Sequence, residues 1–148
     1  MKTIALLCSF YYLLTGIDLN YLRTNYYKSV SDKSLCQNMI TDLENDKDKS
    51  AVQLAYLGGL QTIWANHVFS PISKLSTFNE GKKNIELAVS KDPNNIEIRF
   101  VRLSVQEKIP SFLGYKSNIK EDTEMIKNNL SQVKSKQLLE NIELLLKD

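Results

Sequence analysis

The stretch that decides the fold runs from residue 50 to residue 67 and reads SAVQLAYLGGLQTIWANH. Its apolar residues recur at helical spacing on more than one side, which is typical of a helix buried at the centre of a domain. Gly58 and Gly59 stand in its middle, where each glycine costs about 1 kcal/mol relative to alanine. The pair indicates either that another backbone passes close by or that the stretch is two shorter helices.

Helical spacing also appears on both sides of this stretch. Further helices are predicted from the apolar residues in 19–30, 35–43, 75–89, 119–130 and 138–146. Two of them begin at capping-box spacings, Ser34 with Gln37 and Asn118 with Glu121. Residues 96–106 mix alternating and helical patterns, and we expect a helix there because helices flank the segment.

Turn-forming residues are scarce, with five Gly and three Pro in 148 residues. A sandwich or barrel with many strands needs more turns than these residues provide. We therefore expect an all-α fold of about seven helices.

The first 16 residues have the order of a secretory signal peptide. Lys2 precedes an apolar run from Ile4 to Leu14, and Thr15-Gly16 follows it. We expect residues 1–16 to be a signal peptide and residues 17–148 a single exported domain, periplasmic or secreted. The alternative is that the run is the buried first helix of a cytoplasmic protein.

Removal of residues 1–16 would leave a chain with a net charge of +1 and one cysteine, Cys36. A nearly neutral chain does not have the basic surface of a nucleic-acid-binding protein. Cys36 follows Leu35 on an apolar helix face, which favours a small buried side chain over a reactive thiol.

Gly81, Ile85, Ala88 and Pro93 stand at spacings of four, three and five residues. This half-repeat resembles the second helix of a tetratricopeptide repeat, where small residues let paired helices approach and a proline closes the unit. The resemblance implies a solenoid of antiparallel helix pairs with a groove for protein segments. The whole chain also resembles small exported bacterial helical proteins without an assigned function.

Six residues are candidates for lining such a groove: Trp64, His67, Arg99, Arg102, Phe112 and Tyr115. Some of them lie in segments 67–77 and 110–116, which would be insertions in the repeat pattern, and the two arginines stand where repeats carry apolar residues. Such departures from a local pattern are typical of functional positions.

Each candidate also has a structural explanation. Arg99 and Arg102 share a helix face and could bind a carboxylate or phosphate, or pair with Glu97, Glu107 or a neighbouring helix. The segment with Phe112 and Tyr115 could be a recognition loop or a hydrophobic plug. His67, next to Trp64, could transfer protons or could bind helix-end carbonyls.

The sequence carries no phosphate-binding loop, nucleophile elbow or metal-binding motif. We therefore expect a binding or adaptor protein with a protein or peptide partner, no cofactor, no nucleic acid and no transmembrane span. One alternative is a structural subunit of an envelope complex. The other is an enzyme that uses His67 with a carboxylate such as Glu80 or Glu107.

Overall fold

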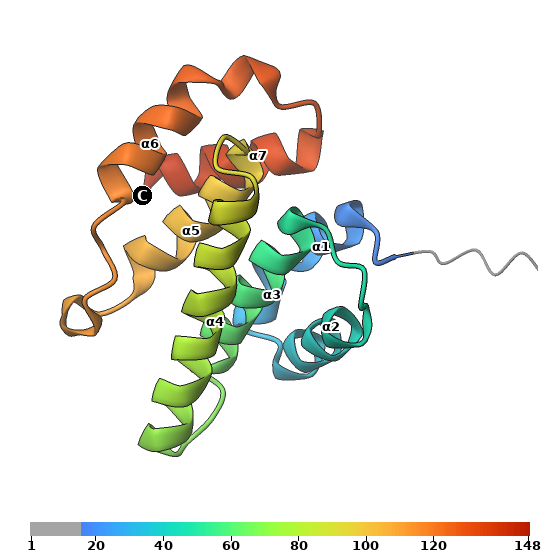
Figure 1. Ribbon diagram of the computed structural model, residues 1–148, viewed down its shortest axis with the longest axis vertical. Helices are drawn as coiled ribbons and strands as arrows, with labels where there is room; N and C mark the ends of the chain where they lie inside the picture. Colours follow the sequence, from blue (N-terminus) through green and yellow to red (C-terminus); the bar gives the residue numbers. More distant parts are fainter. Residues whose placement is uncertain (1–15) are drawn as a thin grey trace, which may run out of the picture.

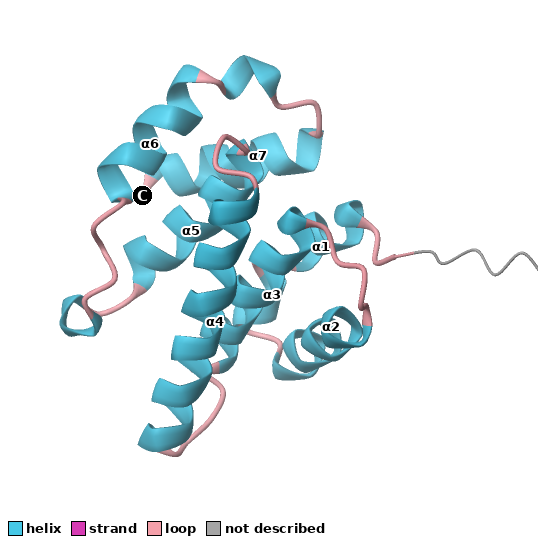
Figure 2. Ribbon diagram, viewed as in Figure 1, coloured by secondary structure: helices cyan, strands magenta, loops and turns pink. Residues whose placement is uncertain are grey.

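The computed structural model describes residues 16–148, and this part of the chain consists of helices and loops without a strand (Figures 1 and 2). It contains seven α-helices: α1 (Leu19–Asn25), α2 (Lys33–Asn45), α3 (Ala51–Trp64), α4 (Pro71–Lys91), α5 (Ile96–Lys108), α6 (Ile119–Asn128) and α7 (Lys136–Lys147). Three short 3₁₀ turns lie between them: η1 (Lys28–Val30), η2 (Ser111–Leu113) and η3 (Leu130–Gln132). The all-α prediction is confirmed for these residues. The predicted signal peptide, apart from Gly16, lies outside them.

Helix α3 is the centre of the fold, as its apolar pattern predicted. It packs against α2, α4 and α5, and every residue from Gln53 to Thr62 is buried, so the helix is covered on all sides. The helix begins with a capping box, in which Ser50 Oγ accepts from the Gln53 amide (3.1 Å) and Gln53 Oε1 accepts from the Ser50 amide (2.7 Å).

Helix α3 is continuous through Gly58 and Gly59, so the glycine pair does not divide it into two helices. The two glycines instead let other segments approach α3 closely. A Cβ atom at Gly58 would lie 2.5 Å from the Gly81 carbonyl oxygen, and one at Gly81 would lie 2.5 Å from the Gly58 carbonyl oxygen. Helices α3 and α4 therefore touch through their backbones at this point, which requires glycine on both.

The ambiguous segment from Ile96 onward forms α5, so the helix prediction is confirmed. Asn95 caps the helix by accepting from the amides of Glu97 (3.0 Å) and Ile98 (3.2 Å). Every residue of α5 from Glu97 to Gln106 is buried. Apolar residues therefore occur on both faces of the helix, which produces the mixture of alternating and helical patterns in the sequence.

Both predicted capping boxes are wrong. Asp32, not Ser34, caps α2, by accepting from the Leu35 amide (2.9 Å). Asn118 stands at the start of α6 without capping it, because Asn118 Oδ1 accepts from Gln106 Nε2 (3.0 Å) and its amide donates to Gln106 Oε1 (3.1 Å). A contact between distant segments has replaced the local one.

Helices α1 and α7, the first and the last within residues 16–148, lie against each other. Asn141 Nδ2 on α7 donates to the Arg23 carbonyl on α1 (2.8 Å). The Arg23 guanidinium makes two 2.7 Å hydrogen bonds to Glu97 on α5, which also accepts from the Tyr56 hydroxyl (2.8 Å). A contact between helices as far apart in the sequence as α1 and α7 is not part of an open solenoid, in which each repeat contacts only its neighbours.

Cys36 is a buried core residue, as predicted. Its side chain has no exposed surface, and burial raises the pKa of its thiol to about 12. A thiol with such a pKa is not a nucleophile at neutral pH. Among the described helices, none combines the length and apolarity that crossing a bilayer requires.

Candidate functional site

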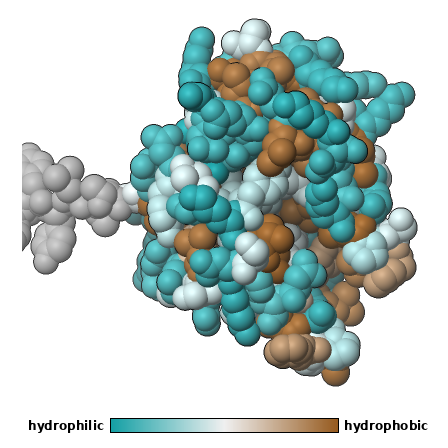
Figure 3. Space-filling model, turned by 180° about the vertical axis from the view of Figure 1, so that it is seen from behind, coloured by the Kyte–Doolittle hydropathy of each residue, from teal (hydrophilic) through white to brown (hydrophobic). Residues whose placement is uncertain are grey.

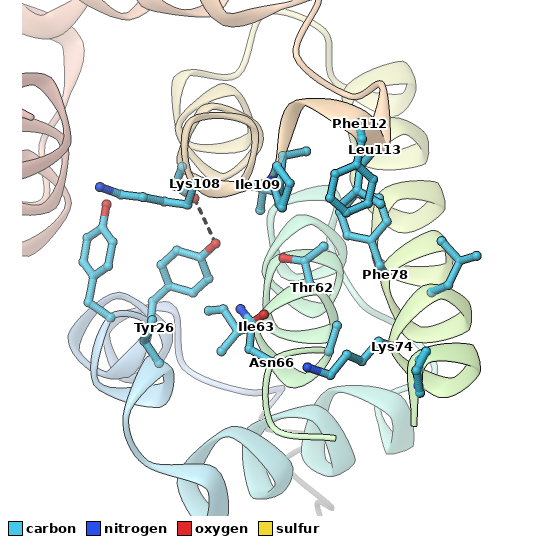
Figure 4. A pocket seen from close by; sticks show the side chains of 18 residues that line it. Tyr26, Thr62, Ile63, Asn66, Lys74, Phe78, Lys108, Ile109, Phe112 and Leu113 are labelled. Atoms are coloured by element: carbon cyan, nitrogen blue, oxygen red, sulfur yellow. Dashed lines mark hydrogen bonds between the residues drawn. The ribbon is translucent and has the colours of Figure 1, made fainter. Parts of the chain in front are cut away.

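An apolar groove of about 580 Å³ opens between the end of α3, the first half of α4 and the end of α5. Turns η1 and η2 close its two sides, and Figure 4 shows Thr62 and Ile63 facing Phe78, Ile109 and Leu113 across the space. The lining consists of Tyr26, Tyr27, Val30, Thr62, Ile63, Ala65, Asn66, Pro71, Lys74, Leu75, Phe78, Ser104, Val105, Lys108, Ile109, Pro110, Phe112 and Leu113.

The rim of the groove is unusually apolar. Leu75 and Phe112 are 51% and 85% exposed, and just outside the lining Phe69 and Ile72 are 94% and 83% exposed. Seen from behind, apolar surface follows the edge of the molecule where α4 begins and η2 projects (Figure 3). Clustered apolar side chains in water are typical of a surface that binds a partner.

Local sequence explains how α4 contributes to the groove. Ser70 caps α4 and Pro71 takes its first position, so the helix begins beside the groove. Leu75 and Phe78 are three residues apart and share one face. Phe78 is buried and packs edge-on against Tyr115, with 6.3 Å between ring centroids, whereas Leu75 reaches the rim.

Two tyrosines, Tyr26 and Tyr27, line the groove. The Tyr26 hydroxyl is bonded to Ser104 Oγ (2.9 Å), as Figure 4 shows. The Tyr27 hydroxyl is, within residues 16–148, the one buried side-chain polar atom without a hydrogen-bond partner. Burial raises the pKa of Tyr27, so its hydroxyl is a neutral donor at physiological pH.

Lys74 and Lys108 are the charged residues of the lining, which contains no Asp or Glu. They lie on opposite sides of the opening, and Lys74 extends toward Asn66 (Figure 4). Lys108 pairs with Asp148 (2.8 Å) in an exposed ion pair. No carboxylate within residues 16–148 pairs with Lys74 at 4.0 Å or less. The groove is therefore an apolar site with a positive edge.

The two candidate arginines lie elsewhere, with their guanidinium groups bound to carboxylates of neighbouring helices. Asp122, which has no exposed surface, accepts from Arg99 (2.8 Å) and from Arg102 (2.7 and 2.8 Å). Arg99 also reaches Glu121 (2.7 Å), and Arg102 reaches Glu86 (3.2 Å). Although burial opposes its charge, the hydrogen bonds to Asp122 raise the pKa of Arg102. This is the second of the two explanations given above, pairing with a neighbouring helix.

The two candidate aromatic residues of the loop differ in burial. Tyr115 is 4% exposed and donates to Glu86 Oε1 (2.6 Å), so it packs as a plug. Phe112 projects from η2 at the rim of the groove. Gly114 between them has φ +65°, a left-handed conformation that favours glycine.

Trp64 and His67 form a separate cluster near η1. Their ring centroids are 5.8 Å apart, and Lys33 Nζ lies 5.4 Å from the centre of the Trp64 ring. His67 Nε2 is hydrogen-bonded to the Ser29 carbonyl (3.0 Å), and no carboxylate in residues 16–148 pairs with His67. Neither Glu80 nor Glu107 is thus placed to act with it.

The structure brings only one of the six candidates, Phe112, to the groove. Sequence reasoning missed Lys74, Leu75 and Lys108 as site residues. Leu75 belongs to one of the predicted helical stripes. A signal for its exposure is its position just after the Ser70-Pro71 pair, where a helix begins. In the part of the chain that the structure describes, no cluster of His, Cys, Asp or Glu side chains could hold a metal ion.

Comparison with known proteins does not assign the chain to a family. The chain matches no protein-family model, no curated protein and no solved structure. The site must therefore be interpreted from its own chemistry.

Proposed function

We propose that the protein binds an apolar segment of another protein in the groove between α3, α4 and α5. The observation that carries this proposal is the groove itself, about 580 Å³ of apolar space with Leu75 and Phe112 exposed at its rim. Burying two such side chains stabilises a complex by about 1.5–3 kcal/mol each. The surface that these two side chains expose to water contributes nothing to the fold, which favours a role in binding.

A protein segment fits better than a small solute because the apolar surface extends beyond the groove. Phe69 and Ile72 lie outside the lining and are almost fully exposed. A ligand confined to the cavity would leave both side chains in water, whereas a longer segment can cover them. Large apolar anchors seated in a groove are typical of the sites that dominate protein association.

We propose that α3 and α4 form a pair like the helices of a tetratricopeptide repeat. Gly81, Ile85 and Ala88 on α4 are buried, and Gly81 and Ile85 lie close to Gly58 on α3. Pro93 follows the end of α4 by two residues. These are the roles that the half-repeat implied: small residues for close approach and a proline to close the unit.

We propose that binding takes place in the cell envelope after removal of residues 1–16. The basic, apolar and small residues of this segment support export, and α1 begins beyond the boundary with Asp18 as its cap. Mass spectrometry of the chain from each cell fraction tests the proposal. An envelope form that begins at Ile17 is expected, and a full-length cytoplasmic form would contradict it.

Site-specific photo-crosslinking in the producing cells tests the binding function. A photoreactive residue replaces Leu75 or Phe112 at the rim, or Leu144 on α7 as a control of matched exposure (54% against 51% for Leu75). We expect the two rim positions to crosslink to one apolar segment of a partner, identified by mass spectrometry. The Leu144 position should not reach this segment.

A second substitution links the crosslink to the groove. With the photoreactive group at position 75, Phe112→Asp should abolish the crosslink, because a carboxylate would replace an apolar anchor. Leu144→Asp should leave it unchanged. Equal crosslinking from positions 75 and 144 would contradict the proposal and would favour a structural subunit with broad contacts.

A further inference from the structure

Building on the proposed function, we infer that the groove takes an amphipathic helix that carries carboxylates beside its apolar face. Three properties of the groove carry this inference: the helices that form it, the sign of the charges on its edge, and the buried hydroxyl of Tyr27.

The secondary structure around the groove favours a helical occupant. Its walls are helix faces and 3₁₀ turns, and residues 16–148 contain no strand whose edge could pair with an extended segment. Without such an edge, the backbone of an extended segment would lose its hydrogen bonds to water and gain none. A helix satisfies its own backbone and presents a stripe of apolar side chains to the groove.

The charges of the groove select acidic residues in that helix. Lys74 and Lys108 stand on opposite sides of the opening, and no lining residue is acidic. Carboxylates flanking the apolar stripe would meet one lysine on each side, whereas lysines at the same places would be repelled. Lys108 can exchange its exposed partner Asp148, because such surface pairs contribute little stability.

The Tyr27 hydroxyl adds to this preference. Tyr27 is one of the residues that line the groove, and its buried hydroxyl has no acceptor within residues 16–148. Buried polar groups in proteins are rarely left without a partner. A carboxylate on the occupant can accept its hydrogen bond, and an ammonium group cannot.

Selection from a displayed peptide library tests the inference. Each member is a helix of about 15 residues, a length that can form isolated helix, with leucines at i, i+3, i+4 and i+7. The flanking positions are Glu, Gln or Lys in all combinations. The library is selected on the wild-type protein and on the charge-reversed variant Lys74→Glu with Lys108→Glu. The best acidic peptide and its lysine counterpart are then compared by fluorescence anisotropy.

We expect the wild-type protein to enrich Glu at the flanking positions and the charge-reversed variant to enrich Lys. The acidic peptide should bind the wild-type protein about tenfold more tightly than its lysine counterpart, since it gains two pairs and avoids two repulsions. The control variant Lys83→Glu with Lys147→Glu has the same net charge as the charge-reversed variant, but both positions lie outside the groove. It should keep the preference for Glu.

The controls separate failure of the inference from failure of the proposed function. Enrichment without a charge preference, or a preference that the charge-reversed variant keeps, would overturn the inference and leave groove binding intact. Two results would contradict the proposed function itself. One is that the peptides bind the variant Leu75→Asp with Phe112→Asp as tightly as the wild-type protein, and the other is that no peptide binds either the wild-type or the charge-reversed protein.

A lipid could offer the same combination of apolar chain and carboxylate. Dodecanoate is therefore added as a competitor to the bound acidic peptide. We expect dodecanoate below its critical micelle concentration not to displace the peptide, because a single acyl chain cannot cover the apolar rim beyond the groove. Displacement by dodecanoate would assign the groove to acyl chains and overturn the inference.

Discussion

Asp122 shows how one residue determines the role of two others. Its carboxylate is fully buried and accepts hydrogen bonds from both Arg99 and Arg102. Sequence spacing correctly placed the arginines on one helix face, but it could not show that a carboxylate 20 residues away binds both. The guanidinium groups hold α5 to α6 instead of extending into a groove.

Replacing this carboxylate should cost substantial stability. In Asp122→Asn, two buried guanidinium groups lose their shared counter-charge. We expect the free energy of unfolding to fall by about 3 kcal/mol, the lower end of the range for breaking a buried pair, because Glu86 and Glu121 remain. Urea denaturation followed by circular dichroism measures the change. Glu121→Gln, at a side chain that is 60% exposed, is the control and should cost less than about 1 kcal/mol.

Burial of ionisable side chains predicts a loss of stability in alkali. Burial raises the pKa of Cys36 to about 12, from an ordinary 9.0, and the pKa of Tyr26 to about 12, from 10.0. The unfolded chain thus loses these protons at lower pH than the folded chain. The free energy of unfolding should be constant up to about pH 9 and then fall as the pH rises toward 12.

Urea denaturation at a series of pH values checks this profile. Burial also raises the pKa values of Tyr56 and Tyr115, so the decline should steepen above pH 10. Cys36→Ala removes one titrating group and should delay the onset of the decline. A profile that is flat to pH 12 would show that these side chains are exposed to water.

At the scale of elements, the contact of α3 with α4 fixes the centre of the fold. Gly58 and Gly81 face each other so closely that neither position has room for a Cβ atom. The glycine that costs helix stability in isolation therefore allows α3 and α4 to pack in direct backbone contact. This contact is where the sequence pattern and the structure agree best.

Gly58→Ala should accordingly destabilise the protein, although alanine normally stabilises a helix by about 1 kcal/mol relative to glycine. The new methyl group would force α3 away from α4, and we expect a loss of about 1–3 kcal/mol. Thermal unfolding by calorimetry measures it. Ser76→Ala, at an exposed position on α4, is the control and should stay within about 0.5 kcal/mol. A stabilised Gly58→Ala variant would contradict the observed packing.

The elements themselves were largely predictable from the sequence, because each helix carries its own pattern of apolar residues. The segment 67–77, expected as an insertion in the repeat pattern, is not one, because residues 71–77 form the first part of α4, whereas Pro110 follows the end of α5. The capping boxes at Ser34 and Asn118 were not predictable from spacing alone. Asp32 competes for the first and Gln106 binds the second, and the latter contact arises only when the chain folds.

At the scale of the whole molecule, the groove exists because distant segments meet. Its lining extends from Tyr26 to Leu113 and includes four separate parts of the chain. Leu75 and Phe78 belong to one helical stripe, but Phe78 is buried with Tyr115 of a distant loop packed against it, whereas Leu75 is half exposed. A linear pattern does not contain this information, so the sequence predicted one groove residue and missed the others.

Amide chemical-shift mapping by NMR tests the central claim, that this groove is the binding surface, most directly. The ¹⁵N-labelled protein is titrated with the tightest acidic helix from the selection. We predict that the largest shifts lie at the groove, including Lys74, Leu75, Lys108 and Phe112, and vanish in Leu75→Asp with Phe112→Asp. Shifts gathered around Leu144 on α7, or unchanged by this double substitution, would contradict the claim.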